Sequence, residues 1–305
     1  MSNKLHKELK LLLDFYSKQR KNLPDDFCYS PGVISSPSFF TVKSLQGHLN
    51  NPLLNPAWVH FVSGGKSISL QEACLFKQVQ SNQLQFMDKR LINKKLTEGA
   101  AVVLEGVDIL EASINTFIGK LEDALPCSLA GAVAFFSQAG GTEAYEAHCD
   151  SDDVLVIQLS GKKLWNLYQP QQRRFADTTH LKGDKLGPKI KEVTMHPGDA
   201  MYVRAGVPHS CETTGDHSLH IAFDLIDSTP NVKQITEEAN GAYDYACEEA
   251  HASPTKVLKR YIDLLESEDF QNHIEKATEG VRQEARQFRE SIGNSASVRA
   301  LSKYF

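Results

Sequence analysis

The chain has 305 residues, with 33 basic against 38 acidic side chains and a formal net charge of −5 at pH 7. The sequence pI near 6.1 excludes the global attraction to phosphate that an electrostatic DNA or RNA binder needs. The length suits one large catalytic domain with a smaller appendage. Six cysteines without C-x-x-C pairs indicate reduced thiols, so we expect a cytoplasmic protein with no membrane segment.

The first part of the chain predicts helices around a long connecting loop. Residues 4–15 mix charged and apolar side chains and predict an amphipathic helix that docks on the domain. Residues 22–40 are rich in Pro, Ser and Gly and predict a lead-in loop. Residues 41–128 alternate helical and strand-like pieces, with helices expected at 70–79 and at 114–125. In the second helix, four apolar side chains share one face: Ile114, Phe117, Ile118 and Leu121.

From residue 154 the pattern changes to short strands. The apolar run 154–159 predicts a buried strand. A Ser-Gly-Lys turn at 160–162 and the alternation of 163–168 then predict a hairpin. Further strands are expected within 195–203, after a Pro-Gly-Asp turn, and at 218–223. Short strands punctuated by Gly and Pro predict a barrel or a double-sheet jelly roll.

Two separated segments carry candidate metal ligands. In an extended strand, residues i and i+2 project to the same side, so His148 and Asp150 can hold one ion while Cys149 points away. His209, in a Pro-x-His turn, supplies a third ligand from a distant strand. Two imidazoles and one carboxylate form the set that binds non-haem Fe(II) on one face. An H-x-D triplet alone is common, so ordinary core or surface groups remain the alternative.

The order and spacing of these motifs resemble the JmjC-type cupin oxygenases, and within them the branch that includes the ribosomal-protein hydroxylases. The resemblance covers roughly residues 30–230 and is carried by four stretches: 147–150, 153–159, 161–165 and 197–209. It implies a mainly β fold with a double-stranded β-helix (jelly-roll or cupin) core. Helices at the N-terminus and a C-terminal helical region would flank this core.

The resemblance implies an enzyme that uses Fe(II), O2 and 2-oxoglutarate to hydroxylate a C–H bond. His148, Asp150 and His209 would be the three iron ligands. In the family, the keto-acid end of 2-oxoglutarate chelates the iron, and its oxidation yields succinate and CO2. The protein would fix the geometry and exclude water.

Lys163 stands where the family places the basic residue that receives the far carboxylate of 2-oxoglutarate. A lysine ammonium has three donors and suits a terminal carboxylate. If Lys163 faces inward, Trp165 shares its face and walls the pocket, and His220 has the parity to point inward near the metal. The alternatives are a solvated hairpin lysine, like Lys162 beside it, and an ordinary buried histidine.

One position departs from the family pattern. Many ribosomal-protein hydroxylases carry an Asn-x-Tyr pair on the strand before the H-x-D motif. Counting back from His148, this chain has Ala134, Phe135 and Phe136 instead. The loss of an amide and a phenol indicates a changed substrate, unless Phe136 only packs in the core. We assign no role to Cys149, which lies between two candidate ligands.

The composition changes near residue 230, so we expect a catalytic domain at 1–232 and a helical region at 233–305. Ser253 and Pro254 predict a helix start, and a second helix is expected from Asp269. The apolar faces of these two helices must pack against another surface, either that of the β core or that of a second copy of the chain. We favour a homodimer through these helices, with intramolecular packing as the alternative. Residues 295–305 are expected to form a tail.

We therefore expect a 2-oxoglutarate-dependent hydroxylase that acts on a protein or peptide side chain. A small molecule or a free amino acid is the alternative substrate. Demethylation of histone-like lysines is less favoured, because the chain shows no chromatin-reading appendage. A metal-binding cupin without oxygenase activity is the rival class. Lys163 discriminates between them, since such a cupin has no need of a buried cation near the metal.

Overall fold

The computed structural model describes residues 3–21, 26–64, 66–68, 74–124, 127–138, 146–170, 179–180, 186–227, 240–247 and 254–292. The chain divides into two compact units. The first, called here the β unit, comprises Met1–Leu121 and Ala130–Leu225. The second, called the helical unit, comprises Glu122–Leu129 and Ile226–Phe305.

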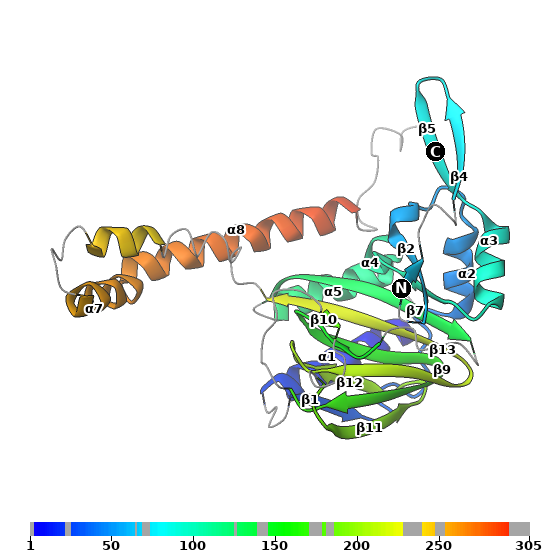
Figure 1. Ribbon diagram of the computed structural model, residues 1–305, viewed down its shortest axis with the longest axis horizontal. Coiled ribbons are helices and arrows are strands. Elements are labelled where there is room, and N and C mark those ends of the chain that lie inside the picture. The colour runs from blue at the N-terminus through cyan, green and yellow to red at the C-terminus, as the bar shows by residue number, and fades with distance from the viewer. Residues whose placement is uncertain are drawn as a thin grey trace. The chain divides into compact units, whose positions relative to one another are not determined.

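The described strands of the β unit form an antiparallel sheet in the order β1-β12-β9-β13-β7-β6-β2-β3 (Figure 1). Their bounds are β1 Phe27–Ser30, β2 Val59–Ser63, β3 Lys66–Ile68, β6 Ala101–Leu104, β7 Cys127–Gln138, β9 Asp153–Tyr168, β12 Ala200–Val203 and β13 His209–Asp227. Three further strands pair beside this path: β8 His148–Cys149, β10 Thr179–His180 and β11 Lys189–Met195. The predicted fold class, mainly β with flanking helices, is confirmed.

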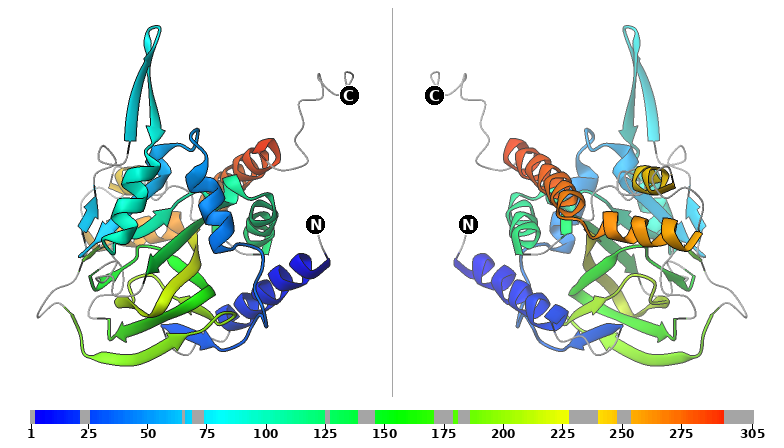
Figure 2. Two further views of the ribbon diagram at one scale, coloured as in Figure 1. Left: turned by 90° about the vertical axis from the view of Figure 1, so that its right-hand side faces the viewer. Right: turned by 90° about the vertical axis from the view of Figure 1, so that its left-hand side faces the viewer.

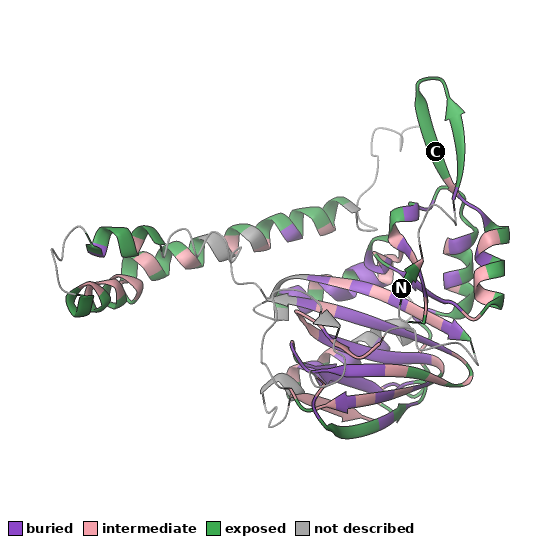
Figure 3. Cartoon of the chain, in the orientation of Figure 1, coloured by how far each residue is buried: buried purple, intermediate pink, exposed green. Residues whose placement is uncertain are grey.

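The hydrophobic core lies between strands that are distant in sequence. One cluster of buried side chains comprises Val154, Val156, Trp165, Leu167, Val193, Met195, Met201, Val203, Val207 and Ala222. Burial of this apolar surface is the main stabilising term of the unit, and Figure 3 shows it as buried stretches along the strands. The predicted strands within 195–203 and 218–223 are confirmed, as β12 and as part of β13.

The predicted hairpin at 160–162 is wrong. Residues 153–168 form one continuous strand, β9, whose two halves pair with β12 and β11 along one edge. The register with β13 shifts between Thr213 and Ser218 and again between Leu219 and His220. Gly161 has a φ of 66°, so the turn signal marks a bulge within a strand.

The bulge changes which side chains face the core. Before it, even-numbered residues such as Val154 and Val156 join the core cluster, whereas after it odd-numbered Trp165 and Leu167 do. A regular strand would have kept the even positions inward. Instead Lys163 is buried and Lys162 is exposed.

Two predicted helices of the β unit are confirmed. The helix α1 spans Asn3–Lys21, and its Tyr16 ring meets Tyr202 edge-on with centroids 5.1 Å apart. The helix α5 spans Ala112–Ala124. Its four predicted face residues, Ile114, Phe117, Ile118 and Leu121, are at most 1% exposed. Three shorter helices accompany them: α2 Val42–Asn50, α3 Lys89–Thr97 and α4 Val107–Leu110, with a 3-10 turn η1 at Pro56–Trp58.

Two other expectations are wrong in part. Residues 74–79 form the strand β4, Cys74–Val79, which pairs with β5, Asn82–Met87 (Figure 2). The spacing of apolar residues in this stretch fits both a helix and a strand. The tight turn at Gln80, with a φ of 54°, favours a pair of strands. Residues 70–73 lie outside the described residues. The expected lead-in loop at 22–40 contains β1, which pairs with β12.

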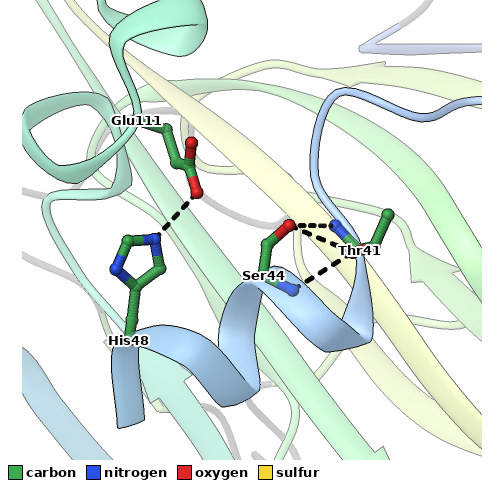
Figure 4. A network of polar contacts seen from close by, with 4 residues as sticks. All are labelled: Thr41, Ser44, His48 and Glu111. Atoms are coloured by element: carbon green, nitrogen blue, oxygen red, sulfur yellow. Dashed lines mark hydrogen bonds and ion pairs between the residues drawn. The ribbon is translucent and has the colours of Figure 1, made fainter. Parts of the chain in front are cut away.

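The helix α2 is fixed at both ends by polar contacts (Figure 4). At its start Thr41 and Ser44 form a reciprocal capping box. Near its end, His48 Nε2 lies 2.8 Å from Glu111 Oε1, and Glu111 directly precedes α5. These contacts hold α2 in place without using any residue of the cavity described below.

In the helical unit, α7 spans Pro254–Leu265 and α8 spans Glu268–Ile292. Both starts agree with the sequence prediction to within one residue, although Ser253 itself and the tail at 295–305 lie outside the described residues. Arg289 Nη2 lies 3.3 Å from Glu122 Oε1, and both side chains are nearly buried. None of the helices that the structure describes is long and apolar enough to cross a membrane.

Gly161→Ala tests the role of the bulge. A Cβ at Gly161 would lie 1.8 Å from the His217 carbonyl oxygen, at a φ that disfavours L side chains. We expect the free energy of unfolding to fall by about 2 kcal/mol or more, measured by urea titration.

Gly119→Ala is the matched control for this substitution. Gly119 lies in α5 with open space around it, so alanine is expected to stabilise by about 0.5–1 kcal/mol. Equal stability of Gly161→Ala and the wild type would contradict the account of the bulge.

Candidate metal centre

Backbone pairing brings the two candidate histidines together. In the antiparallel ladder of β8 and β13, His148 stands opposite His209, and their ring centroids are 4.5 Å apart. Asp150 follows β8 directly. The Gly206 N–H donates to the Asp150 carbonyl at 2.9 Å. The turn before His209 is thus tied to the segment that carries the other two side chains.

The side chains of His148, Asp150 and His209, called here the converging group, point toward one another. His148 Nε2 lies 3.6 Å from Asp150 Oδ1, and His209 Nε2 lies 3.6 Å from Asp150 Oδ2. All three ligand atoms lie within 4.8 Å of one another. Two ligands that are each about 2.1 Å from an ion stand about 3–4 Å apart. The distances among these three side chains therefore allow them to bind one ion together.

Hydrogen bonds fix the donor state of both rings. His148 Nδ1–H donates to the Glu146 carbonyl at 2.8 Å, and His209 Nδ1–H donates to the Val207 carbonyl at 3.1 Å. A carbonyl only accepts, so in the neutral ring Nε2 carries the lone pair that a metal requires. The residues present therefore fit a metal ion.

Cys149 behaves as strand alternation predicts. Its side chain is 0% exposed and is not part of the converging group. By contrast, the Asp150 side chain is 29% exposed and the His209 side chain 5% exposed. The carboxylate thus stands at the open side of the group, and the imidazole of His209 on the buried side.

The converging group lines a cavity of about 310 Å³ that also contains Lys163. Lys163 is 3% exposed. Its Nζ donates to Ser137 Oγ and to Thr213 Oγ1, each at 3.2 Å. Burial lowers the pKa of this amino group. Within the described part of the chain, no carboxylate forms an ion pair with Lys163, so the cavity contains an ammonium held only by hydroxyls.

Sequence reasoning placed Trp165 and His220 in this cavity, and both line it. The His220 ring stacks on Phe135 with centroids 4.8 Å apart. Burial lowers the pKa of His220 well below its ordinary value, so the ring is neutral. Its Nδ1 has no partner among the described residues.

Sequence reasoning missed the two hydroxyls that hold Lys163. Counting back from His148 compared Ala134 and Phe136 with the family's Asn-x-Tyr pair. On β7, however, Phe135 and Ser137 lie beside His220 and Lys163 respectively. Phe136 lines the cavity and Ala134 does not. The sequence did offer one sign of this arrangement. Ser137 comes two residues after the apolar Phe135, so the two side chains lie on the same face of β7.

Three further acidic side chains line the cavity: Glu105, Asp152 and Asp224. Burial first, and then the negative charges of Asp150, Asp152 and Glu105, raise the pKa of Asp224 to about 7. Sequence reasoning did not single out any of these three residues.

Comparison with known proteins identifies the fold family. Residues 111–234 match the family model described as a JmjC domain. The chain therefore carries a JmjC domain. The X-ray structure of E. coli ycfD superimposes with a TM-score of 0.53 at 14% identity, over 84% of this chain and 68% of that one. The jelly-roll core implied by the sequence is thereby confirmed.

Curated relatives match parts of this chain. A Dictyostelium discoideum protein named bifunctional lysine-specific demethylase and histidyl-hydroxylase NO66 is 26% identical over 70% of this chain. Ribosomal oxygenase 2 of Bos taurus is 30% identical over 36% of this chain. The matched stretches make up only 40% and 25% of the relatives' own lengths. The chain therefore corresponds to less than half of either relative.

Lys163→Met separates a binding role from a structural one. An anchor for 2-oxoglutarate predicts that its Kd rises at least about tenfold, measured by calorimetry with Mn(II). The metal-free variant is expected to gain on the order of 1 kcal/mol in unfolding free energy, because a buried ammonium without a counter-charge opposes folding.

Lys162→Met is the matched control, because this neighbouring lysine is exposed. Lys162→Met is expected to change neither the Kd of 2-oxoglutarate nor the free energy of unfolding. A Lys163→Met variant that loses stability but binds 2-oxoglutarate as tightly as the wild type would show that Lys163 is structural.

Proposed function

We propose that this chain is an Fe(II)- and 2-oxoglutarate-dependent oxygenase that hydroxylates a C–H bond on a protein or peptide side chain. The observation that carries the proposal is a single cavity lined both by the converging group and by a buried lysine. A metal-binding cupin without oxygenase activity would gain nothing from an ammonium that opposes folding.

His148, Asp150 and His209 would hold Fe(II) on one face. The opposite face would stay open for the keto-acid group of 2-oxoglutarate and for O2. When bound, the iron supplies activation of O2, with 2-oxoglutarate as reductant, and the products are succinate, CO2 and the hydroxylated side chain. The two Nδ1–H bonds to backbone carbonyls keep both rings oriented for this task.

The remaining residues bind and orient. Lys163 would receive the far carboxylate of 2-oxoglutarate, and the hydroxyls of Ser137 and Thr213 would share that carboxylate or hold the ammonium in place. The Trp165 ring would wall the bound acid. Apolar side chains such as Phe135 would exclude water from the same space and so strengthen the charge–charge contact.

The names of the relatives support a protein substrate. One is called a histidyl-hydroxylase and lysine-specific demethylase, the other a ribosomal oxygenase. Hydroxylation of a small molecule or free amino acid is the alternative. We also propose that residues 1–232 form the catalytic domain and that the chain works in the cytoplasm, consistent with the free thiols of Cys28, Cys74 and Cys247.

The visible spectrum tests the proposal. Under argon, the protein with Fe(II) and 2-oxoglutarate is expected to show the weak charge-transfer band of the chelate. His148→Ala and Asp150→Ala remove a proposed ligand, so each is expected to abolish the band. His196→Ala is the control, because His196 is exposed and lies outside the cavity. Absence of both the band and succinate formation in the wild type would favour the cupin without oxygenase activity.

We propose further that residues 233–305 mediate a homodimer. In support, α7 has no buried residue, and its Leu258 and Ile262 are 55% and 51% exposed. Apolar helix faces of this kind are covered in stable proteins.

Sedimentation velocity over a concentration series tests the dimer. The double variant Leu258→Glu, Ile262→Glu is expected to shift the wild-type dimer to monomer. Leu84→Glu is the control, since Leu84 is 42% exposed on β5. A wild type that stays monomeric at every concentration would contradict the proposal.

A further inference from the structure

The β unit contains a second cavity, of about 300 Å³, which is called here the helix groove. It is lined by α2 and α3, which lie side by side in Figure 1, and by one face of β6 and β7. Its apolar lining residues follow helical steps of three or four, with Val42, Leu45 and Leu49 on α2 and Ile92 and Leu96 on α3. The groove is therefore built from the facing apolar stripes of two helices.

The helix groove lies on the opposite face of β6 from the cavity of the converging group. Ala101 and Val103 line that cavity, whereas Val102 between them lines the groove, as strand alternation requires. Phe136, which stands opposite Val102 in the ladder of β6 and β7, is the one described residue that lines both. Neither Lys163 nor any member of the converging group lines the groove.

The floor of the helix groove is apolar and closed off from solvent. Leu45, Leu49, Ile92 and Val102 line it and are between 0% and 8% exposed. Protein interiors seldom leave a space of this size between buried aliphatic side chains. Water is a poor occupant of such a floor, which offers it no polar partner. A flexible apolar chain would instead restore the contacts of a packed core.

The rim of the helix groove is polar and carries an unpaired cation. Gln46, Asn93 and Lys89 line the groove and are exposed. Within the described part of the chain, no carboxylate pairs with Lys89. The adjacent Asp88 carboxylate is bound by Arg90 Nη2 at 3.1 Å. The Lys89 ammonium is thus left to bind an anionic group at the mouth of the groove.

The charge of the two helices favours an anion as well. Neither α2 nor α3 contains an Asp or Glu within its bounds, and their lysine and arginine side chains are Lys43, Lys89, Arg90, Lys94 and Lys95. The chain as a whole has a formal net charge of −5, so this positive surface is a local feature. Such a surface attracts anions and repels cations.

We propose that the helix groove binds a medium-chain aliphatic carboxylate, with the acyl chain on the apolar floor and the carboxylate at Lys89. A volume of about 300 Å³ lies at the lower end of the range for small-molecule sites, about 300–1,000 Å³. The apolar floor excludes a strongly polar ligand, and the basic rim excludes a cationic lipid. The site is separate from the metal centre, so its existence does not depend on the proposed function.

Methyl NMR tests the location and the apolar part of the site. The full chain, labelled at Ile, Leu and Val methyl groups and loaded with Zn(II) and 2-oxoglutarate, is titrated with hexanoate, octanoate and decanoate below their micelle concentrations. The methyl signals of Leu45, Ile92 and Val102 are expected to shift. Each added pair of methylene groups is expected to tighten binding by about tenfold, because burial of one methylene contributes about 0.8 kcal/mol.

Decanol and decyltrimethylammonium test the role of the carboxylate. Decanoate is expected to bind about threefold or more tightly than decanol, the scale of an exposed ion pair, and decyltrimethylammonium is expected to bind more weakly than either. Lys89→Met is expected to abolish the preference for decanoate over decanol. Lys94→Met is the matched control, because it removes the same charge from α3 at a position outside the groove, and it is expected to keep the preference.

Four results would overturn the proposal. One is equal binding of decanoate and decanol to the wild type, and another is a preference that survives in Lys89→Met. A third is a shift of the Val103 and Val154 methyl signals in place of those of the groove, or a loss of the groove shifts in Lys163→Met, since either places the acid in the other cavity. The fourth is a shift of the Ile92 signal with protein concentration alone, which would show that a second copy covers the groove.

Discussion

The antiparallel pairing of β8 with β13 is the constraint on which the rest of the cavity depends. It places His148 opposite His209, and the Gly206 to Asp150 backbone bond keeps the intervening carboxylate beside them. Ladder pairing leaves little freedom in strand register once one face is buried. The candidate metal centre is thus built by backbone hydrogen bonds, and two more backbone carbonyls orient its imidazoles.

A local irregularity of the sheet then determines the chemistry of the cavity. The bulge at Gly161 turns Lys163 inward, toward the space that the converging group lines. At the other end of β13, Asp224 presents the opposite charge to the same space. Both charges oppose folding in the absence of ligands. The retention of Lys163 makes sense if its ammonium meets a carboxylate of a ligand.

The convergence of His148, Asp150 and His209 could be predicted because strand alternation and motif order are both read directly from the sequence. The hairpin at 160–162 could not be told from a bulge, since Gly161 satisfies either a turn or a close backbone approach. Residues 74–79 fitted the helical and the strand period alike. Ser137 was missed because its position depends on which face of β7 turns inward. Asp224, an acid within an apolar strand, was a signal in the sequence that remained unused.

X-ray absorption at the iron edge of the anaerobic Fe(II) protein tests the central claim most directly. The claim is that His148, Asp150 and His209 together hold one ion. The account predicts a first shell of nitrogen and oxygen atoms at about 2.0–2.2 Å, with the multiple-scattering pattern of two imidazoles that falls to one in His209→Ala. A sulfur ligand in the first shell, as Cys149 or Cys211 would supply, or an imidazole count that His209→Ala leaves unchanged, would contradict it.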